Sequence, residues 1–418
     1  MEGGHPSGAD VVAARPMSSF PDPLLRFRPE FPILEKSTYL ISNSLGAMPR
    51  RAAEALAEYA ETWETRGARA WAEGWWEMSA TVGDEIAPLL GAPPGTVSML
   101  PNVTIASAVV LSSLEFTSAR NRIVLVEGEF PTVRYLYETL GPRLGAEIVV
   151  VPSPAHDGLS ADESHICEAI DGRTALVAIS HVLFKSAFVL DVPAIAEKCR
   201  REGAILALDG YQSVGTIPVS VEDLGADILV GGVLKWLCGG PGGAFLYVRP
   251  ELRRRLEPSL TGWMAHPAPF DFEAPPMRWR DDAFRFLLGT PAIPALYAAR
   301  EGPRIVLEAG VEAIRAKSLK QTERLISLGR DRGFRCAASS DPARRGGTIA
   351  VDFEHALEVS RELNARDVVV DYRPGAGIRM SPHFYTADRE LDRAFEAIDE
   401  IRASGAWKRW RDRPVIVT

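Results

Sequence analysis

The sequence is poor in cysteine and carries no excess of positive charge. Only 4 of its 418 residues are cysteine. Their positions lack the paired close spacing of a structural zinc site or a redox dithiol, so we expect no metal site and a reducing, cytoplasmic setting. The formal net charge of −8 gives no uniform basic field for a polyanion, and nucleic acid is not an expected partner. The cysteines are Cys167, Cys199, Cys238 and Cys336.

Long apolar runs are also missing. No segment has the roughly 18 uninterrupted apolar residues of a membrane helix, so we expect no membrane span. Residues 1–20 mix Gly, Pro, Ser and Ala with charges and contain no continuous apolar core. This composition predicts a disordered leader rather than a secretory signal. The rest of the chain is long enough to bury a large core, and its length suggests two domains.

What the sequence does contain is a series of short, β-branched apolar runs separated by helical or loop stretches. Their continuous hydrophobicity suits strands that are covered on both faces. The pattern predicts an α/β fold with a mostly parallel seven-stranded sheet between helices. The runs are 97–100, 123–126, 148–151, 175–179, 205–208, 228–230 and 244–248.

The pattern changes after residue 248. A Trp- and Pro-rich stretch leads into a long helical region, which is followed by two strand candidates and a closing helix; this predicts a smaller α+β domain. We assign 60–290 to the large domain, and 21–59 together with 291–418 to the small domain. The segments after residue 248 are 262–280, 292–332, 347–352, 368–372 and 389–401.

A carboxylate and an amine follow two neighbouring predicted strands. Asp209 closes the run 205–208, and Lys235 follows the run 228–230, just before a glycine-rich turn. Open α/β sheets bind ligands at the carboxyl ends of their strands. Pyridoxal 5'-phosphate (PLP) needs both groups, because the amine forms a Schiff base with its aldehyde and the carboxylate keeps its pyridine nitrogen protonated. Either residue alone would more often be a cap or a surface charge, but their joint placement predicts a PLP site.

Two other strand ends carry candidate cofactor groups. Asn102, Val103 and Thr104 open a predicted helix whose free N–H groups can receive a phosphate, with an ordinary N-cap as the open alternative. Phe130 follows the next strand and is placed to lie flat on an aromatic cofactor, with a core position as its alternative.

From about Tyr39 to the closing helix, the sequence resembles the class V aminotransferase superfamily of fold-type I PLP enzymes, and within it the kynureninases. The resemblance implies the fold-type I PLP-dependent transferase fold. Its landmarks are Asn43-Ser44-Leu45-Gly46, Arg69-Ala70-Trp71, Val82-Gly83-Asp84, Phe130-Pro131-Thr132, Lys235 with Gly239-Gly240-Pro241-Gly242, Gly262-Trp263, Gly289-Thr290-Pro291 and Ile378-Arg379.

The resemblance also implies how the cofactor would be held. Trp263 and Thr290 match residues that reach the phosphate of the neighbouring subunit's cofactor, which implies a homodimer. Within one subunit, the matching residues are Val103 and Thr104 at the phosphate, Phe130 on the ring, Ser180 close to the cofactor, Asp209 at the pyridine nitrogen, Gln212 near the ring hydroxyl, and Lys235 as the Schiff-base lysine.

For an amino-acid substrate, the resemblance implies that Arg379 holds the α-carboxylate, a task suited to a planar guanidinium. Asn43, Ser44 and Trp71 match positions near the substrate side chain in kynureninases. For Trp71, a place in an aromatic core with Trp75 and Trp76 is the open alternative.

The implied activity is hydrolytic cleavage of a Cβ–Cγ bond, with Lys235 removing the α-proton and kynurenine giving anthranilate and alanine. Three positions depart from the kynureninase pattern. Leu234 replaces a usual tyrosine, Val133 replaces an aspartate near the pyridine, and Gln212 replaces a frequent histidine. A class V aminotransferase, or a lyase, epimerase or desulfurase for another amino acid, is therefore the alternative. A PLP-binding protein without turnover is the third.

Overall fold

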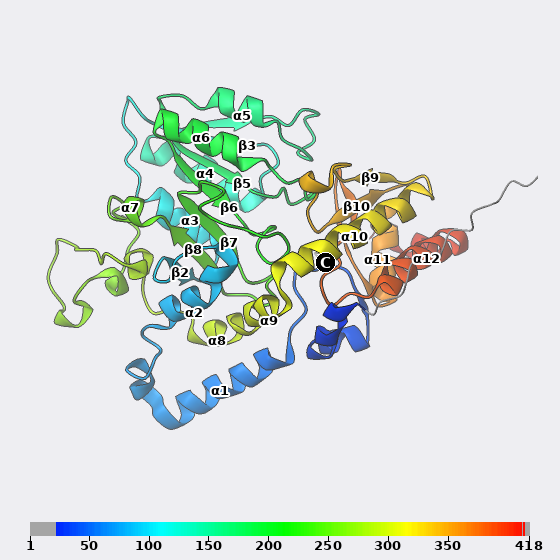
Figure 1. Cartoon of the computed structure of the whole chain (residues 1–418), viewed down its shortest axis with the longest axis horizontal. Helices are drawn as coiled ribbons and strands as arrows, with labels where there is room; N and C mark the ends of the chain where they lie inside the picture. Colours follow the sequence, from blue (N-terminus) through cyan, green and yellow to red (C-terminus); the bar gives the residue numbers. More distant parts are fainter. Residues whose placement is uncertain (1–21, 412, 414–418) are drawn as a thin grey trace, which may run out of the picture.

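The computed structural model describes residues 22–411 and residue 413, so the predicted leader at 1–20 lies outside the described residues. Figure 1 shows two lobes, a larger one that contains the central sheet and a smaller one that contains most of the C-terminal third of the chain. Among the residues described, no helix is long and apolar enough to cross a membrane.

The larger lobe is built around a seven-stranded sheet with the order β2-β8-β7-β6-β5-β3-β4. Strands β3 to β7 run parallel to one another, and β8 lies antiparallel between β2 and β7. The predicted mostly parallel seven-stranded sheet is therefore confirmed. The strands are β2 (Val97–Leu100), β3 (Arg122–Val126), β4 (Glu147–Val151), β5 (Thr174–Ser180), β6 (Ile205–Asp209), β7 (Ile228–Gly232) and β8 (Ala244–Val248).

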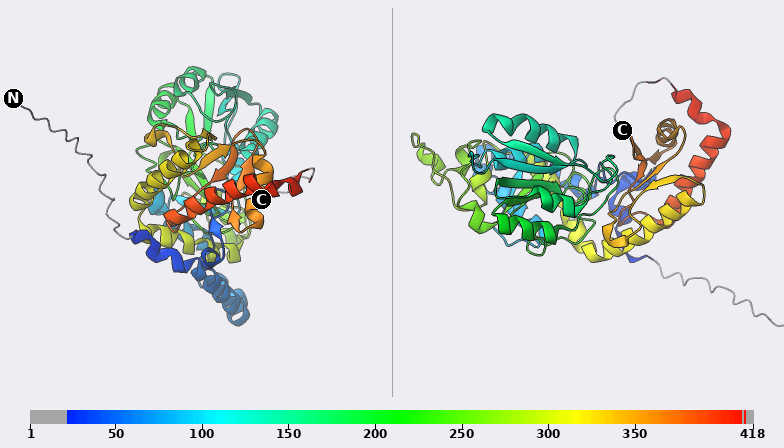
Figure 2. Two further views of the ribbon diagram at one scale, coloured as in Figure 1. Left: turned by 90° about the vertical axis from the view of Figure 1, so that its right-hand side faces the viewer. Right: turned by 90° about the horizontal axis from the view of Figure 1, so that it is seen from above.

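Helices cover both faces of this sheet, as the view from above in Figure 2 shows. Alternate residues of each strand enter different cores: Val124 packs in the core that includes α6, whereas Ile123 and Leu125 pack against α3 and α4. Burial on both faces is why the strands are continuously apolar. The covering helices are α3 (Val103–Leu111) and α4 (Pro131–Leu140) on one face, and α2 (Met78–Ile86), α5 (Glu163–Ala169) and α6 (Val192–Glu202) on the other.

The smaller lobe has an antiparallel sheet with the order β12-β13-β10-β9 and its own apolar core. A separate two-stranded sheet joins β1 to β11 in parallel, which ties the N-terminal segment to this lobe. The elements are β1 (Thr38–Tyr39), β9 (Arg335–Ala337), β10 (Ile349–Asp352), β11 (Val368–Val369), β12 (Asp371–Arg373), β13 (Gly377–Met380), α10 (Val311–Arg330), α11 (Ala356–Ala365) and α12 (Asp388–Ser404).

Two predicted elements are divided in the structure. The helical region 292–332 forms α8 (Ile293–Ala299), α9 (Glu301–Ala309) and α10. Pro303 explains the first break, because its ring would clash with the Ala299 carbonyl in a continuous helix; Gly310, at φ +82°, makes the second. The predicted strand 368–372 divides into β11 and β12 because the chain passes from one sheet to another.

Helix α1 (Arg50–Arg66) packs along α8 and α9 and stands out from the body of the molecule at the bottom of Figure 1.

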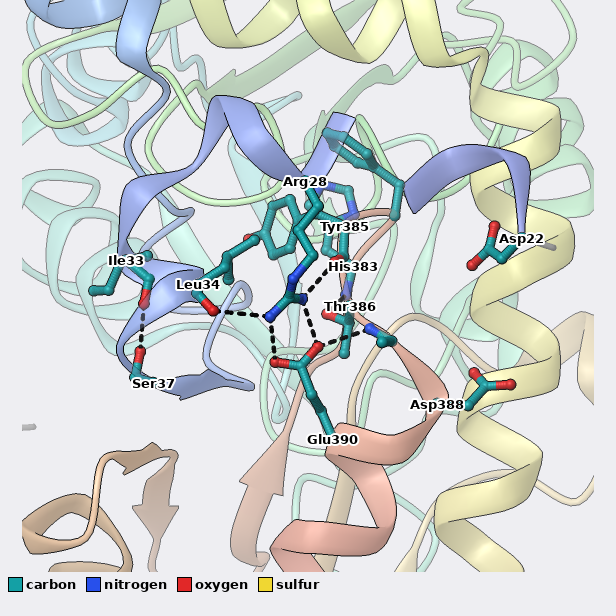
Figure 3. Close-up of polar contacts among 12 residues, drawn as sticks. Asp22, Arg28, Ile33, Leu34, Ser37, His383, Tyr385, Thr386, Asp388 and Glu390 are labelled. Atoms are coloured by element: carbon teal, nitrogen blue, oxygen red, sulfur yellow. Dashed lines mark hydrogen bonds and ion pairs between the residues drawn. The ribbon is translucent and has the colours of Figure 1, made fainter. Parts of the chain in front are cut away.

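Ahead of α1, a largely buried ion pair fastens the N-terminal segment to α12. The Arg28 guanidinium donates to both Glu390 oxygens at 2.6 and 3.1 Å and to the carbonyl oxygens of Leu34 and Tyr385 at 2.9 and 3.0 Å. Figure 3 shows the guanidinium between Leu34 and Glu390. The Glu390 side chain is only 8% exposed, so removal of its partner would leave a buried, unpaired charge.

We expect Arg28→Ala to lower the free energy of unfolding by about 2–3 kcal/mol, somewhat below the cost of breaking a fully buried pair because the Arg28 side chain is 22% exposed. Arg50→Ala is the matched control. The Arg50–Glu35 pair has side chains that are 52% and 66% exposed, so its loss should cost less than about 1 kcal/mol. Urea denaturation of both variants measures the difference, and equal costs would contradict a structural role for the Arg28 pair.

Candidate active site

The strand register brings the ends of several strands to one edge of the large sheet. Ser180 lies opposite Asp209 in the β5–β6 ladder, and Asp209 lies opposite Val230 in the β6–β7 ladder. Leu100 of β2 and Gly232 of β7 both pair with the same β8 residue, so these two strands also end at the same level. The loops that carry the predicted cofactor groups therefore all leave the same edge of the sheet, where α/β proteins bind ligands.

The loop of Lys235 is fixed by close backbone packing. The Gly46 nitrogen donates to the Leu234 carbonyl at 2.9 Å. A Cβ atom on Gly46 would lie 2.1 Å from the Lys235 carbonyl oxygen, so only glycine allows this approach. Within the loop, the Cys238 nitrogen donates back to the Lys235 carbonyl at 3.0 Å. These contacts place the segment around Gly46 directly against the lysine loop.

The Lys235 amine lies among aromatic rings and buried charges. Its Nζ atom is 4.3 Å from the ring centroid of Tyr211 and 5.4 Å from that of Phe130. Burial lowers the pKa of Lys235 to about 8, an effect that Asp209 opposes and Arg379 reinforces. An amine with this pKa is about one-tenth neutral at pH 7, far more than an ordinary lysine, and the neutral form is the one that attacks an aldehyde.

Asp209 is held at the end of β6 by its neighbour in the chain. Its Oδ1 accepts a hydrogen bond from the Tyr211 nitrogen at 2.8 Å. Burial raises the pKa of Asp209, while that N–H and the Lys235 charge lower it. A positively charged ring nitrogen would compensate the buried carboxylate further, which is the contact that PLP provides.

The start of α3 retains donors for an anion. Asn102 caps the helix by accepting from the Ile105 nitrogen at 2.9 Å. The other first-turn N–H groups, which include those of Val103 and Thr104, have no acceptor within the helix, because the first four N–H groups of an α-helix precede its hydrogen-bond ladder. The capping alternative and the predicted phosphate role are therefore compatible at this helix end.

Gln212 connects the lysine loop to the N-terminal segment. Its Nε2 donates to the Asn43 carbonyl at 3.0 Å, and its Oε1 accepts from Trp236 Nε1 at 2.9 Å. The Asn43 side chain itself has both amide atoms buried without a partner among the described residues. Buried polar groups without partners are rare in native proteins, so this amide is a candidate ligand-binding group.

Arg379 is held in a fixed orientation by a residue that the sequence analysis missed. Asp371 accepts from its Nε and Nη2 atoms at 2.8 and 2.5 Å, and the Phe184 carbonyl accepts from Nη1 at 2.6 Å. The Phe184 ring in turn meets the Phe130 ring edge-on at 5.2 Å. Asp371 and Arg379 face each other across the β12–β13 hairpin, so turn residues such as Gly375 were the signal that could have paired them.

Trp71 and Trp263 lie in two separate aromatic pairs. The Trp71 ring packs edge-on against Trp75 at 5.6 Å, as the aromatic-core alternative required, but Trp76 packs instead against Trp263 at 5.0 Å.

Ser44 lies in the turn before Gly46, where its nitrogen donates to the Ile41 carbonyl.

Trp263 and Thr290 lie on neighbouring segments of the surface. Trp263 is 40% exposed, and Thr290 is also exposed. A Cβ atom on Gly262 would lie 2.3 Å from the backbone of Leu288, so the segments that carry the two residues pack directly together.

Glu129 and Tyr211 complete the site edge and were not expected as functional residues. Glu129 precedes Phe130 and is 3% exposed. The Tyr211 hydroxyl would be 2.5 Å from a Cβ on Gly232, so the phenol occupies the space that this glycine leaves free. Burial of a carboxyl group at a strand end was not visible in the sequence, because its hydrogen-bond partner comes from a different strand.

The groups present fit PLP: an amine of lowered pKa, a buried carboxylate, a helix start with free donors, and a 42% exposed aromatic ring at Phe130. Within residues 22–411, no group of three or more His, Cys, Asp or Glu side chains is arranged to hold a metal ion.

Comparison with known proteins identifies the family of the chain. The family model for class V aminotransferases matches residues 38–382. The chain is 32% identical over 381 residues to the uncharacterized aminotransferase YcbU of Bacillus subtilis, covering 90% of this chain and 97% of that protein. It is 30% identical over 400 residues to a kynureninase of Burkholderia pseudomallei, covering 93% and 94% of the two chains.

Solved structures show the same fold. The apo cysteine desulfurase of Thermococcus onnurineus NA1 superposes with a TM-score of 0.81 at 21% identity, over 93% of this chain and all of the other. A mutant of C-DES, which has glycine covalently linked to its PLP cofactor, gives 0.80 at 22% identity, over 89% and 98%. The chain thus belongs to the class V aminotransferase family, and its cofactor is pyridoxal 5'-phosphate.

Proposed function

We propose that the protein is a PLP-dependent hydrolase that cleaves the Cβ–Cγ bond of an amino acid with a γ-carbonyl group, as kynureninase does. Kynurenine and one water molecule would give anthranilate and alanine. The observation that carries the proposal is the buried Asn43 amide, whose two polar atoms have no partner among the described residues. A γ-carbonyl oxygen would satisfy its donor.

Each residue has a task that its surroundings support. PLP, when bound, supplies the electron sink for charge at the substrate's Cα. The Arg379 fork, aligned by Asp371, would hold the α-carboxylate. Asp209 would keep the ring nitrogen protonated, and the neutral Lys235 amine would accept the α-proton.

A desulfurase reaction is less well supported by the thiols of this chain. Cys238 is 2% exposed, and burial raises its pKa to about 12, so it is neither mobile nor a thiolate at neutral pH. Burial likewise raises the pKa of Cys167, Cys199 and Cys336. The competing proposal is transamination, which the similarity to YcbU and the absence of a tyrosine at Leu234 favour.

We also propose that the enzyme acts as a homodimer, in which Trp263 and Thr290 contribute to the partner's cofactor site. The exposure of both residues on adjoining segments supports this arrangement.

Incubation of the PLP-loaded protein with kynurenine or 3-hydroxykynurenine should release alanine together with the matching anthranilate, measured by chromatography. Asn43→Ala should reduce kcat/KM for this cleavage by about 10- to 100-fold, the scale of one lost hydrogen bond to a reacting group. Absence of both products, with conversion of the cofactor to its pyridoxamine form by an amino donor, would establish the aminotransferase alternative.

Loading of the apo-protein with PLP should accelerate with rising pH around a midpoint near 8, because only the neutral Lys235 amine reacts. Asp209→Asn should move this midpoint lower, since the Asp209 carboxylate raises the pKa of that amine. Stopped-flow absorbance at saturating PLP measures both rates.

Lys235→Ala should abolish the Schiff-base absorbance and the exposed Lys36→Ala should retain it; retention by Lys235→Ala would refute the lysine assignment.

Shared sites predict complementation between inactive variants. Refolding a mixture of Lys235→Ala and Trp263→Ala chains should restore activity that neither variant has alone, because a mixed dimer contains one site with both intact residues. Lys235→Ala chains refolded under the same conditions without the second variant are the control. Failure to regain activity, with mixed dimers demonstrated by mass, would contradict a shared site.

A further inference from the structure

Two buried carboxyl groups lie on either side of strand β5 at the site edge. Asp209, at the end of β6, lies opposite Ser180 in the β5–β6 ladder. On the other side, Glu129 accepts hydrogen bonds from the Ser180 backbone nitrogen at 2.7 Å and from its hydroxyl at 2.5 Å. The order across the sheet is therefore Glu129, Ser180, Asp209, and Ser180 directs both of its donors to Glu129.

A cavity of about 20 Å³ adjoins both carboxyl groups. Its polar lining consists of Glu129, Asp209, Ser107 from α3 and Tyr137 from α4, and Val133 also borders it. A cavity of this volume with several polar groups has room for one bound water molecule.

The surroundings favour one negative charge on the two acids rather than two. Burial raises the pKa of Glu129 to about 8, although the two hydrogen bonds from Ser180 favour the ionised form and lower it. The charge of Asp209 adds to the effect of burial, and Arg134 of α4 opposes it. Burial also raises the pKa of Asp209, against the Tyr211 N–H and the Lys235 charge. With a pKa of about 8, Glu129 holds the proton at neutral pH. The Lys235 cation favours the charged form of Asp209 and not that of Glu129.

We propose that Glu129 is a positioning residue for the cofactor: as a protonated acid it hydrogen-bonds to Asp209 through a water molecule in this cavity, and thereby controls the charge beside the pyridine nitrogen. Ionisation of Glu129 adds a second negative charge at the same place. The inference rests on PLP as the cofactor and is independent of the reaction that the enzyme catalyses.

Val133 occupies a position at which this chain lacks a carboxyl group. In the kynureninases that the sequence resembles, the matching position is an aspartate near the pyridine, whereas Val133 brings no carboxyl group to this cavity. Val133 and Glu129 border the same cavity from positions four residues apart in the chain. Glu129 accordingly supplies, from the preceding loop, the second carboxyl group that position 133 lacks.

The test compares PLP affinity in the wild type and Glu129→Gln across pH. Glutamine keeps the size of the side chain and imitates the protonated acid, but it cannot ionise. The ratio of the variant's Kd to the wild-type Kd should be near 1 at about pH 7 and about tenfold higher at about pH 9. At the higher pH, Glu129 is ionised in the wild type and strengthens binding of the protonated pyridine ring, whereas the glutamine of the variant stays neutral. Lys235 titrates in both proteins, so its contribution cancels in the ratio.

Glu127→Gln is the matched control. Glu127 accepts from the nitrogen and hydroxyl of Ser153, both at 2.8 Å, and these bonds lower its pKa. Its ratio should stay flat, because Glu127 is already ionised. In the double variant Glu129→Gln/Val133→Asp, the pH-dependent affinity should return toward that of the wild type. A flat ratio for Glu129→Gln, or an equal rise for Glu127→Gln, would overturn the proposal.

A second measurement needs no bound cofactor. The infrared carbonyl band of a protonated carboxylic acid should disappear from the apo-protein with a midpoint near pH 8. It should persist in Asp209→Asn and be absent in Glu129→Gln. If the wild-type protein shows only carboxyl groups that ionise near their usual pKa of about 4, Glu129 does not hold the proton and the proposal fails.

Discussion

The hydrogen-bond ladders of β5, β6 and β7 are the constraint on which the site depends. Their parallel register sets Ser180, Asp209 and Val230 at one level, so the loops beyond these strands begin side by side. Continuous apolar residues bury the sheet on both faces and make the register rigid. A shift of one residue would turn Asp209 into the opposite core and separate it from Lys235.

Burial gives the site its chemistry. It lowers the pKa of the Lys235 amine and raises that of the Asp209 carboxyl, and each group moderates the shift of the other. In the smaller lobe, Asp371 pairs with Arg379 through two hydrogen bonds, so that this buried guanidinium, in a residue only 2% exposed, keeps its orientation. The site thus contains several buried charges, each with a partner that is itself fixed by the fold.

The N-terminal segment links the two lobes to this site. Arg28 fastens it to α12, and β1 pairs with β11 in the smaller lobe. A few residues later, Gly46 packs on the carbonyl of Lys235, and the Asn43 carbonyl receives Gln212. The segment therefore connects the smaller lobe to the lysine loop through backbone contacts that leave no room for a side chain at Gly46.

By itself, the sequence determined the strands, because burial on both faces imposes apolar runs with visible ends. It also indicated Asp209 and Lys235, because Asp209 closes one such run and Lys235 lies five positions after the last residue of another, Val230. It missed the breaks at Pro303 and Gly310 within a helical pattern, although both residues are visible in it. Only the tertiary structure decided where Glu129 and Asp371 lie and which groups they contact. Their partners, Ser180 and Arg379, come from other strands, and neither the packing of those strands nor the desolvation that shifts a pKa has a signature in local sequence.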